Sequence, residues 1–201
     1  MRNKPKARPA VASHGGEGQL RIIAGTWRSR QFNFPMAAGL RPTPNRVRET
    51  LFNWLAPHVE GARVLDVFTG SGALFLEALS RGAGSALALD QNPAAINALR
   101  GHLQILRCDN GQMLNTDALR YLQQQAATAF DLVFLDPPFG QDLLRPACAA
   151  LEEQGWLSKD AWIYTESENP PSSLGLPGNW RLHREQKAGQ VYYALWDRSA
   201  A

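Results

Sequence analysis

Four consecutive residues, Asp136, Pro137, Pro138 and Phe139, could activate a poorly nucleophilic amine. They follow the apolar run LVFL, which predicts that they leave the carboxyl end of a buried strand. Two prolines fix an extended backbone whose carbonyl groups stay free to accept hydrogen bonds. If the Asp136 carboxylate and the Pro137 carbonyl accept both N–H bonds of a purine amine, its lone pair can attack an electrophile, and Asp136 can help remove the surplus proton. Phe139 would stack on the base, and an ordinary Pro-Pro turn is the alternative.

A second group, the stretch DVFTGSG over residues 66–72, lies where a predicted strand ends and a predicted helix begins. This is the ligand-binding edge of an open α/β sheet, and glycines there let a ligand approach the backbone. A dinucleotide fingerprint would need a third glycine where this sequence has Phe75, so NAD is disfavoured. The acidic Asp66 instead suits a cofactor with an ammonium group and no pyrophosphate, such as S-adenosylmethionine. A purely structural strand-turn-helix is the alternative.

Two further aspartates follow predicted strands. Asp90 ends the second strand, where its carboxylate could accept hydrogen bonds from both ribose hydroxyls of a nucleoside cofactor. Asp117, followed by Ala118, could accept a bond from an adenine amine, or it could simply cap a helix. We also assign Thr43 and Gln91 to the cofactor site.

The elements that must position these residues alternate between strand-like and helix-like segments from Gly61 onward. Strands are predicted at 63–68, 85–90, 112–115, 130–136 and 161–167, with two late strands near 180–186 and 190–196. Helices are predicted at 72–81, after the Asn92-Pro93 pair, after Thr116 and across 142–153. This order is typical of an α/β fold with a mostly parallel sheet and helices on both faces.

The N-terminal region has a different composition. Residues 1–48 hold ten Lys and Arg against one acidic residue, a net charge of +9, whereas the remainder has 11 basic and 17 acidic residues, or −6. A disordered basic tail is expected at 1–18 and a β-hairpin across 19–27 and 30–35, followed by a helix of about three turns that Thr43 can cap. The hairpin extension (19–42) is expected to meet a polyanion, and the remaining residues (43–201) to form the catalytic domain.

Several functional classes are not indicated. Cys108 and Cys148 are far apart, and the four histidines show no ligand spacing, so we expect no disulfide framework and no metal site. No apolar run approaches the roughly 18 residues of a membrane span, and the N-terminus lacks the apolar stretch of a secretory signal. We expect a cytoplasmic monomer that does not enter a membrane.

At this point the sequence resembles class I methyltransferases, and the similarity extends to one family. The stretches RIIAGTWRSR (21–30), LRPTPNRVRETLFNWL (40–55) and KAGQVY (187–192) are similar to those of the bacterial RsmD family, 16S rRNA (guanine(966)-N(2))-methyltransferase. The resemblance covers about residues 19–197. Two departures are Ser29, where the family often has glycine, and Asp90, where it often has glutamate.

The resemblance implies a Rossmann-like fold with a seven-stranded sheet, S-adenosylmethionine as methyl donor, and 16S rRNA of the small subunit or its precursor as substrate. By motif it assigns the donor loop to Asp66, Phe68, Gly70 and Gly72, and the acid that binds the ribose to Asp90. It assigns the adenine contact to Asp117 and Ala118, and the amine site to residues 136–139. The basic residues that we expect to bind RNA are Arg21, Arg28, Arg30, Arg41, Arg46 and Arg48.

Two other functions stay open on the sequence alone. One is methylation of a different amine, such as adenine N6 in DNA or a protein glutamine, although those enzymes more often have Asn-Pro-Pro-Tyr. The other is a non-catalytic RNA-binding protein that has kept the fold, which the intact donor and amine motifs argue against.

Overall fold

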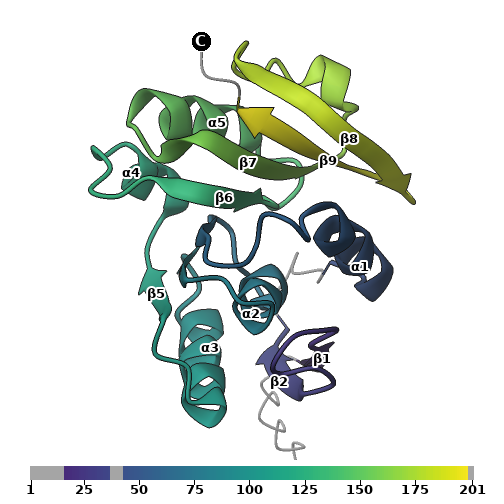
Figure 1. Ribbon diagram of the computed structural model, residues 1–201, viewed down its shortest axis with the longest axis vertical. Coiled ribbons are helices and arrows are strands. Elements are labelled where there is room, and N and C mark those ends of the chain that lie inside the picture. Colours follow the sequence, from purple (N-terminus) through teal and green to yellow (C-terminus); the bar gives the residue numbers. More distant parts are fainter. Residues whose placement is uncertain (1–15, 37–42, 199–201) are drawn as a thin grey trace, which may run out of the picture.

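A seven-stranded sheet forms the centre of the molecule, of which the computed structural model describes residues 16–36 and 43–198 (Figure 1). The strand order is β5-β4-β3-β6-β7-β9-β8. Neighbours among the first five strands run parallel, and β9 pairs antiparallel with both β7 and β8. The bounds are β3 (Arg63–Asp66), β4 (Ser85–Asp90), β5 (Gly111–Asn115), β6 (Phe130–Leu135), β7 (Leu157–Ser167), β8 (Trp180–Ala188) and β9 (Val191–Arg198). The predicted mostly parallel sheet is confirmed.

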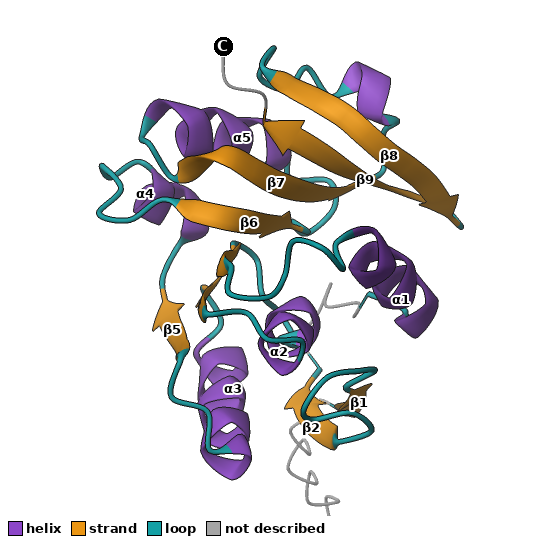
Figure 2. Ribbon diagram, in the orientation of Figure 1, coloured by secondary structure: helices purple, strands orange, loops and turns teal. Residues whose placement is uncertain are grey.

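Helices cover both faces of this sheet (Figure 2). Side chains of a strand alternate between its faces, and β6 shows this: Leu132 and Phe134 join one apolar core, whereas Val133 and Leu135 join the other. The first core contains residues of α1 (Asn45–Trp54), α2 (Ala73–Ser80) and α3 (Pro93–Leu106). The second contains residues of α4 (Ala118–Leu122) and α5 (Leu144–Glu153), and a short 3-10 helix, Pro171–Ser173, follows β7. None of the described helices is long and apolar enough to cross a bilayer.

The strand order reverses direction between β3 and β6. The chain passes from β3 to β4 and β5 on one side, then returns to place β6 and β7 on the other. Ligands of open α/β sheets bind at such a switch point, outside the carboxyl ends of the strands. Asp66, Asp90 and Asp136 all lie at or just after the carboxyl ends of β3, β4 and β6, so the topology gathers them at one edge.

The N-terminal hairpin has shorter strands than the sequence predicted. They are β1 (Glu17–Arg21) and β2 (Gln31–Pro35), and the residues from Ile22 to Arg30 form a turn. Pairing begins at Glu17, which corrects the expectation of disorder through residue 18, because Glu17 and Gly18 pair with Pro35 and Phe34. Strand pairing ends because the Ile23 and Ala24 N–H groups donate to the Glu77 carboxylate instead of to β2. Gly25 then turns the chain with a φ of +81°, and a Cβ there would lie 1.8 Å from the Ser80 carbonyl oxygen.

Some predictions for the N-terminal part lie outside the described residues. These are most of the expected disordered tail (1–18), the final residues of the expected extension (37–42), and Arg41 among the expected RNA-binding residues.

Thr43 does not cap the first helix, contrary to the sequence prediction. Helix α1 begins at Asn45 after Pro44, and no side chain caps it. The Thr43 hydroxyl instead lies 3.1 Å from a Glu166 oxygen and 3.3 Å from an Asp136 oxygen, because the chain enters α1 beside the carboxyl ends of β6 and β7. The other predicted caps, Asn92 on α3 and Asp117 on α4, are confirmed.

Candidate active site

A cavity of about 630 Å³ opens at the carboxyl edge of the sheet. Its size lies in the range of small-molecule and cofactor sites, about 300–1,000 Å³. The structure brings to its walls every predicted donor and amine residue except Gly72, namely Thr43, Asp66, Phe68, Gly70, Asp90, Gln91, Asp117, Ala118, Asp136, Pro137, Pro138 and Phe139.

The turn after β3 forms one wall of the cavity. Asp66 is buried, and its Oδ2 accepts a hydrogen bond of 2.8 Å from the Thr69 hydroxyl. Burial raises the pKa of Asp66 to about 7, and the nearby Asp90 charge adds to the shift. Gly72 lines no part of the cavity: its φ is +78°, and a Cβ there would lie 2.1 Å from Leu99, so this glycine lets α3 pack closely against the start of α2.

Asp90 fixes the same turn from the neighbouring strand. Its Oδ2 accepts a bond of 2.8 Å from the Gly70 N–H, and its Oδ1 accepts one of 2.7 Å from the Asn92 N–H. A carboxylate has about four acceptor positions, so both oxygens retain a lone pair for a ligand hydroxyl. Asp117 caps α4 by accepting a hydrogen bond of 2.8 Å from the Arg120 N–H, and it also lines the cavity. The structure is therefore compatible with both roles predicted for Asp117, the helix cap and the contact with an adenine amine.

The D-P-P-F stretch, which follows β6, forms another part of the cavity wall. Asp136 is partly buried, Pro137 is buried, and Phe139 is 42% exposed where the stretch meets solvent. Burial raises the pKa of Asp136 well above its usual range, and the negative charges of Glu166 and Asp66 raise it further. This part of the wall therefore contains the carboxyl group of Asp136, which can accept hydrogen bonds, and the solvent-accessible ring of Phe139.

The cavity also contains residues that the sequence motifs did not indicate, among them Glu166 and Tyr193. Glu166 is buried at the carboxyl end of β7, and its Oε1 accepts a bond of 2.8 Å from the buried Tyr164 hydroxyl. Burial raises the pKa of Glu166, while the bonds from Tyr164 and Thr43 oppose the shift. A signal for Glu166 was available, since β7 is the next parallel strand beside β6 and an acidic residue at its carboxyl end should reach the same edge.

No lysine, arginine or histidine of the described chain lines this cavity, although it contains Asp66, Asp90, Asp117, Asp136 and Glu166. Buried charges of one sign repel, and each is costly without a partner. The cavity is therefore suited to a ligand that carries positive charge.

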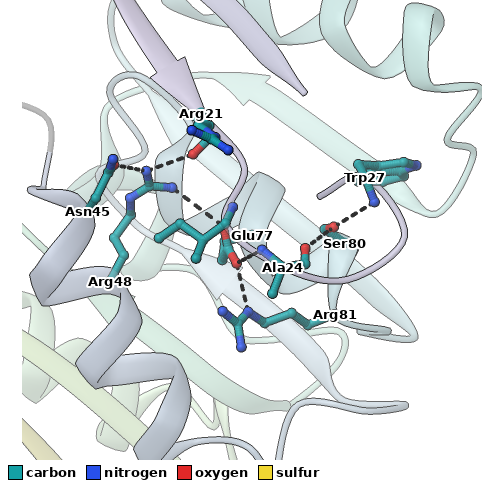
Figure 3. A network of polar contacts seen from close by, with 9 residues as sticks. Arg21, Ala24, Trp27, Asn45, Arg48, Glu77, Ser80 and Arg81 are labelled. Carbon is teal, nitrogen blue, oxygen red and sulfur yellow. Dashed lines mark hydrogen bonds and ion pairs between the residues drawn. The ribbon is translucent and has the colours of Figure 1, made fainter. Parts of the chain in front are cut away.

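The arginines predicted to bind RNA fall into two groups. Arg21, Arg28, Arg30 and Arg46 are exposed. Arg48 is not available for RNA, which corrects the prediction: it is 1% exposed, and its Nη2 donates to the Arg21 carbonyl at 2.8 Å and to Asn45 Oδ1 at 2.6 Å (Figure 3).

Arg48 belongs to a buried network that fixes the hairpin to α1 and α2. Its Nη1 lies 3.5 Å from Glu77, which also pairs with Arg81 at 2.7 Å and accepts the two hairpin N–H bonds. Ser80 adds bonds to the Ala24 carbonyl and from the Trp27 N–H (Figure 3). The hairpin turn therefore contacts α2 at Glu77 and Ser80, about 5 and 9 Å along the helix axis from Leu74, which lines the cavity, at 1.5 Å per residue.

Comparison with known proteins adds to this geometry. Residues 20–197 match the family described as conserved hypothetical protein 95. The ribosomal RNA small subunit methyltransferase D of Escherichia coli (strain K12) is 48% identical over 188 residues, 94% of this chain and 94% of that protein. The protein of the same name from Haemophilus influenzae is 42% identical over 92% of this chain and 97% of that protein. A solved methyltransferase structure from Escherichia coli has a TM-score of 0.85 and 48% identity, covering 92% of this chain and 100% of that chain.

Proposed function

This chain belongs to the RsmD family, described as conserved hypothetical protein 95, and from that premise we propose that it methylates the exocyclic N2 amine of guanine 966 in 16S rRNA. The substrate is the small ribosomal subunit or its precursor, and the methyl donor is S-adenosylmethionine. The observation that carries the proposal is the position of Asp136: it lies in the same cavity as Asp66 and Asp90, facing the donor turn from the next strand.

The residues of the cavity fit S-adenosylmethionine. Asp66 provides a carboxylate for its ammonium group, Asp90 retains acceptor positions for its ribose hydroxyls, and Asp117 with Ala118 lies where its adenine would bind. The absence of cationic side chains among the described lining residues favours a donor with two positive charges and opposes a pyrophosphate. When bound, the donor supplies an electrophilic methyl group on a sulfonium.

Asp136 and Pro137 orient the nucleophile. Their oxygen atoms accept the N–H bonds of the guanine amine, so that its lone pair forms the new C–N bond while the electrons of the S–C bond remain on sulfur. The nitrogen then has a surplus proton, which passes to the Asp136 carboxylate. Phe139 stacks on the base, which must leave its helix or already be unpaired to reach the cavity.

RNA recognition is proposed for the N-terminal extension, residues 19–42, with the basic tail 1–18 before it and the catalytic domain 43–201 after it. The exposed Arg21, Arg28, Arg30 and Arg46 would contact phosphates that flank the target. We propose that the protein acts in the cytoplasm as a monomer.

The experiment that tests this function uses small subunits that lack the modification. They are incubated with the purified chain and isotope-labelled S-adenosylmethionine, and the digested RNA is analysed by mass spectrometry. We expect labelled N2-methylguanosine at one position, and none with Asp136→Ala. Label on adenine of a DNA substrate, or on no nucleic acid, would overturn the proposal.

A further inference from the structure

A single hydroxyl group bridges two carboxyl groups in this cavity. Thr43 Oγ1 lies 3.1 Å from Glu166 Oε1 and 3.3 Å from Asp136 Oδ2. A hydroxyl has one proton to donate, so Thr43 can satisfy only one of two ionised carboxylates. Both contacts are hydrogen bonds only when one of the carboxyl groups carries a proton and donates it to Thr43. The arrangement is therefore suited to sharing one proton between Asp136 and Glu166.

The far end of this chain of hydrogen bonds is fixed. The Tyr164 hydroxyl donates to Glu166 Oε1 at 2.8 Å, and Tyr164 is fully buried. Burial and the neighbouring carboxylates raise the pKa of Tyr164 well above its usual range, so the phenol keeps its proton and remains a donor. Glu166 Oε1 thus receives two hydrogen bonds, which hold its carboxyl group in place and stabilise its negative charge.

The groups that act on Asp136 come from three parts of the fold. They are Thr43 before α1, Asp66 at the end of β3, and Tyr164 and Glu166 on β7, while Tyr193 on β9 lines the same cavity. None of them is cationic, so a bound cationic donor favours the ionised form of both Asp136 and Glu166. A bound donor and a base stacked over Asp136 would separate its carboxyl group from bulk water.

We propose that Glu166 receives, through the Thr43 hydroxyl, the proton that leaves the methylated amine; this inference rests on the proposed function. The N–H bond breaks with its electron pair left on nitrogen, and an O–H bond forms on Asp136. Asp136 then gives this proton to Thr43 Oγ1 while Thr43 gives its own proton to Glu166. Asp136 is again a carboxylate, and Glu166 releases the proton to water after the products leave. Glu166 is thus a positioning residue that acts through Thr43.

The test measures single-turnover methylation of small subunits by the full chain from pH 5.5 to 9.5. At saturating donor, Thr43→Val and Glu166→Gln should each lower the rate about tenfold or more, since positioned proton transfer contributes 10²–10⁴-fold. Thr43→Ser should restore most of the rate. The matched controls are Thr50→Val, whose hydroxyl donates to the Arg46 carbonyl in α1, and the exposed Glu185→Gln. Both controls should behave like the wild type.

The two variants should shift the pH profile in opposite directions, which a merely structural role would not produce. The Thr43 bond lowers the pKa of Asp136 and the Glu166 charge raises it. The acid limb of the profile should therefore move to higher pH in Thr43→Val and to lower pH in Glu166→Gln. Unshifted profiles, or a change confined to KM for the RNA, would overturn the relay.

A second measurement separates this inference from the proposed function. Asp66, with a pKa of about 7, carries a proton of its own in part of the molecules at neutral pH, so infrared spectra are recorded on a chain with Asp66→Asn. The spectrum of this chain should contain the band of a protonated carboxyl group, weakened when Glu166→Gln is added and absent when Asp136→Asn is added as well. A spectrum of the Asp66→Asn chain without that band contradicts the shared proton whatever the enzyme methylates. If the band is present in this chain but the wild-type chain leaves rRNA unmethylated, the function is contradicted and not the shared proton.

Discussion

The buried guanidinium of Arg48 lies 3.5 Å from the buried carboxylate of Glu77 and joins α1 to α2, the two helices whose first turns line the cavity. Glu77 also accepts the backbone bonds that end the first hairpin strand. The hairpin, which we propose contacts RNA, and the turn after β3 are therefore linked through α2.

Replacing Arg48 by Met should lower the free energy of unfolding by about 3–5 kcal/mol, the cost of breaking a buried pair. Glu77 keeps Arg81 and the hairpin N–H bonds, which places the result at the lower end. Arg46→Met, exposed on the same helix, should change stability by less than about 0.5 kcal/mol. Urea denaturation of the two variants checks this prediction, and equal midpoints would contradict the structural role of Arg48.

Asp136→Ala should reduce methyl transfer on the order of 10²-fold or more, because the amine loses its acceptor and its first proton route. Donor affinity, measured by calorimetry, should change little. Asp160→Ala, exposed on β7, is the control. Near-normal turnover of Asp136→Ala would remove this residue from the reaction.

Donor affinity should fall as the pH is lowered through about 7. Asp66 has its pKa raised to that value by burial, and only its charged form pairs with an ammonium group. Below pH 7 donor binding must displace the proton, so the affinity should fall by up to about tenfold per pH unit. Calorimetry between pH 5.5 and 8.5 measures this slope. Asp66→Asn should bind more weakly at pH 8 with a flatter slope, and an equally steep slope in the variant would assign the proton elsewhere.

Asp90→Ala should weaken donor binding by about 1.5–3 kcal/mol, the range for hydrogen bonds to a charged group. The variant also frees the Gly70 and Asn92 N–H groups, which loosens the donor turn. Asp90→Glu, the residue that the family often has, should recover most of the affinity in the same titration. Unchanged affinity in Asp90→Ala would exclude Asp90 from the donor site.

Replacing Arg28 and Arg30 together by Ala should weaken RNA binding and flatten its dependence on salt. Both side chains are exposed in the hairpin turn, and phosphate contacts release counterions. Donor affinity should not change. The control replaces Arg100 and Lys159, exposed on other elements, with Ala. If the folded Arg28 and Arg30 variant binds RNA like the control across a salt series, the RNA docks on another face.

The sequence by itself determined the strands and the acidic residues that end them. Asp66, Asp90 and Asp136 each follow an apolar run, and parallel strands place such residues at one edge wherever the loops lead. The start of α3 could also be predicted from the sequence, because Asn92 can cap a helix whose first residue is Pro93. These features depend on neighbours in the chain, which the sequence contains.

Only the tertiary structure decided the role of Arg48. A basic residue in a basic segment suggests a phosphate contact, yet Arg48 falls on the helical stripe of Leu51 and Phe52, which is buried. That spacing was a signal for burial, but the partner that makes burial tolerable, Glu77, lies on another helix. A long-range ion pair cannot be inferred from one segment.

The same reason applies to Thr43, for which the sequence offered a helix cap. Its hydroxyl bonds residues 93 and 123 positions away, across strands whose order is fixed by the packing of the whole sheet. Whether a side chain caps its own helix or joins distant carboxyl groups depends on which partners folding brings within 3.5 Å. Local propensity specifies the element, whereas the three-dimensional packing of the sheet specifies the hydrogen-bond partner.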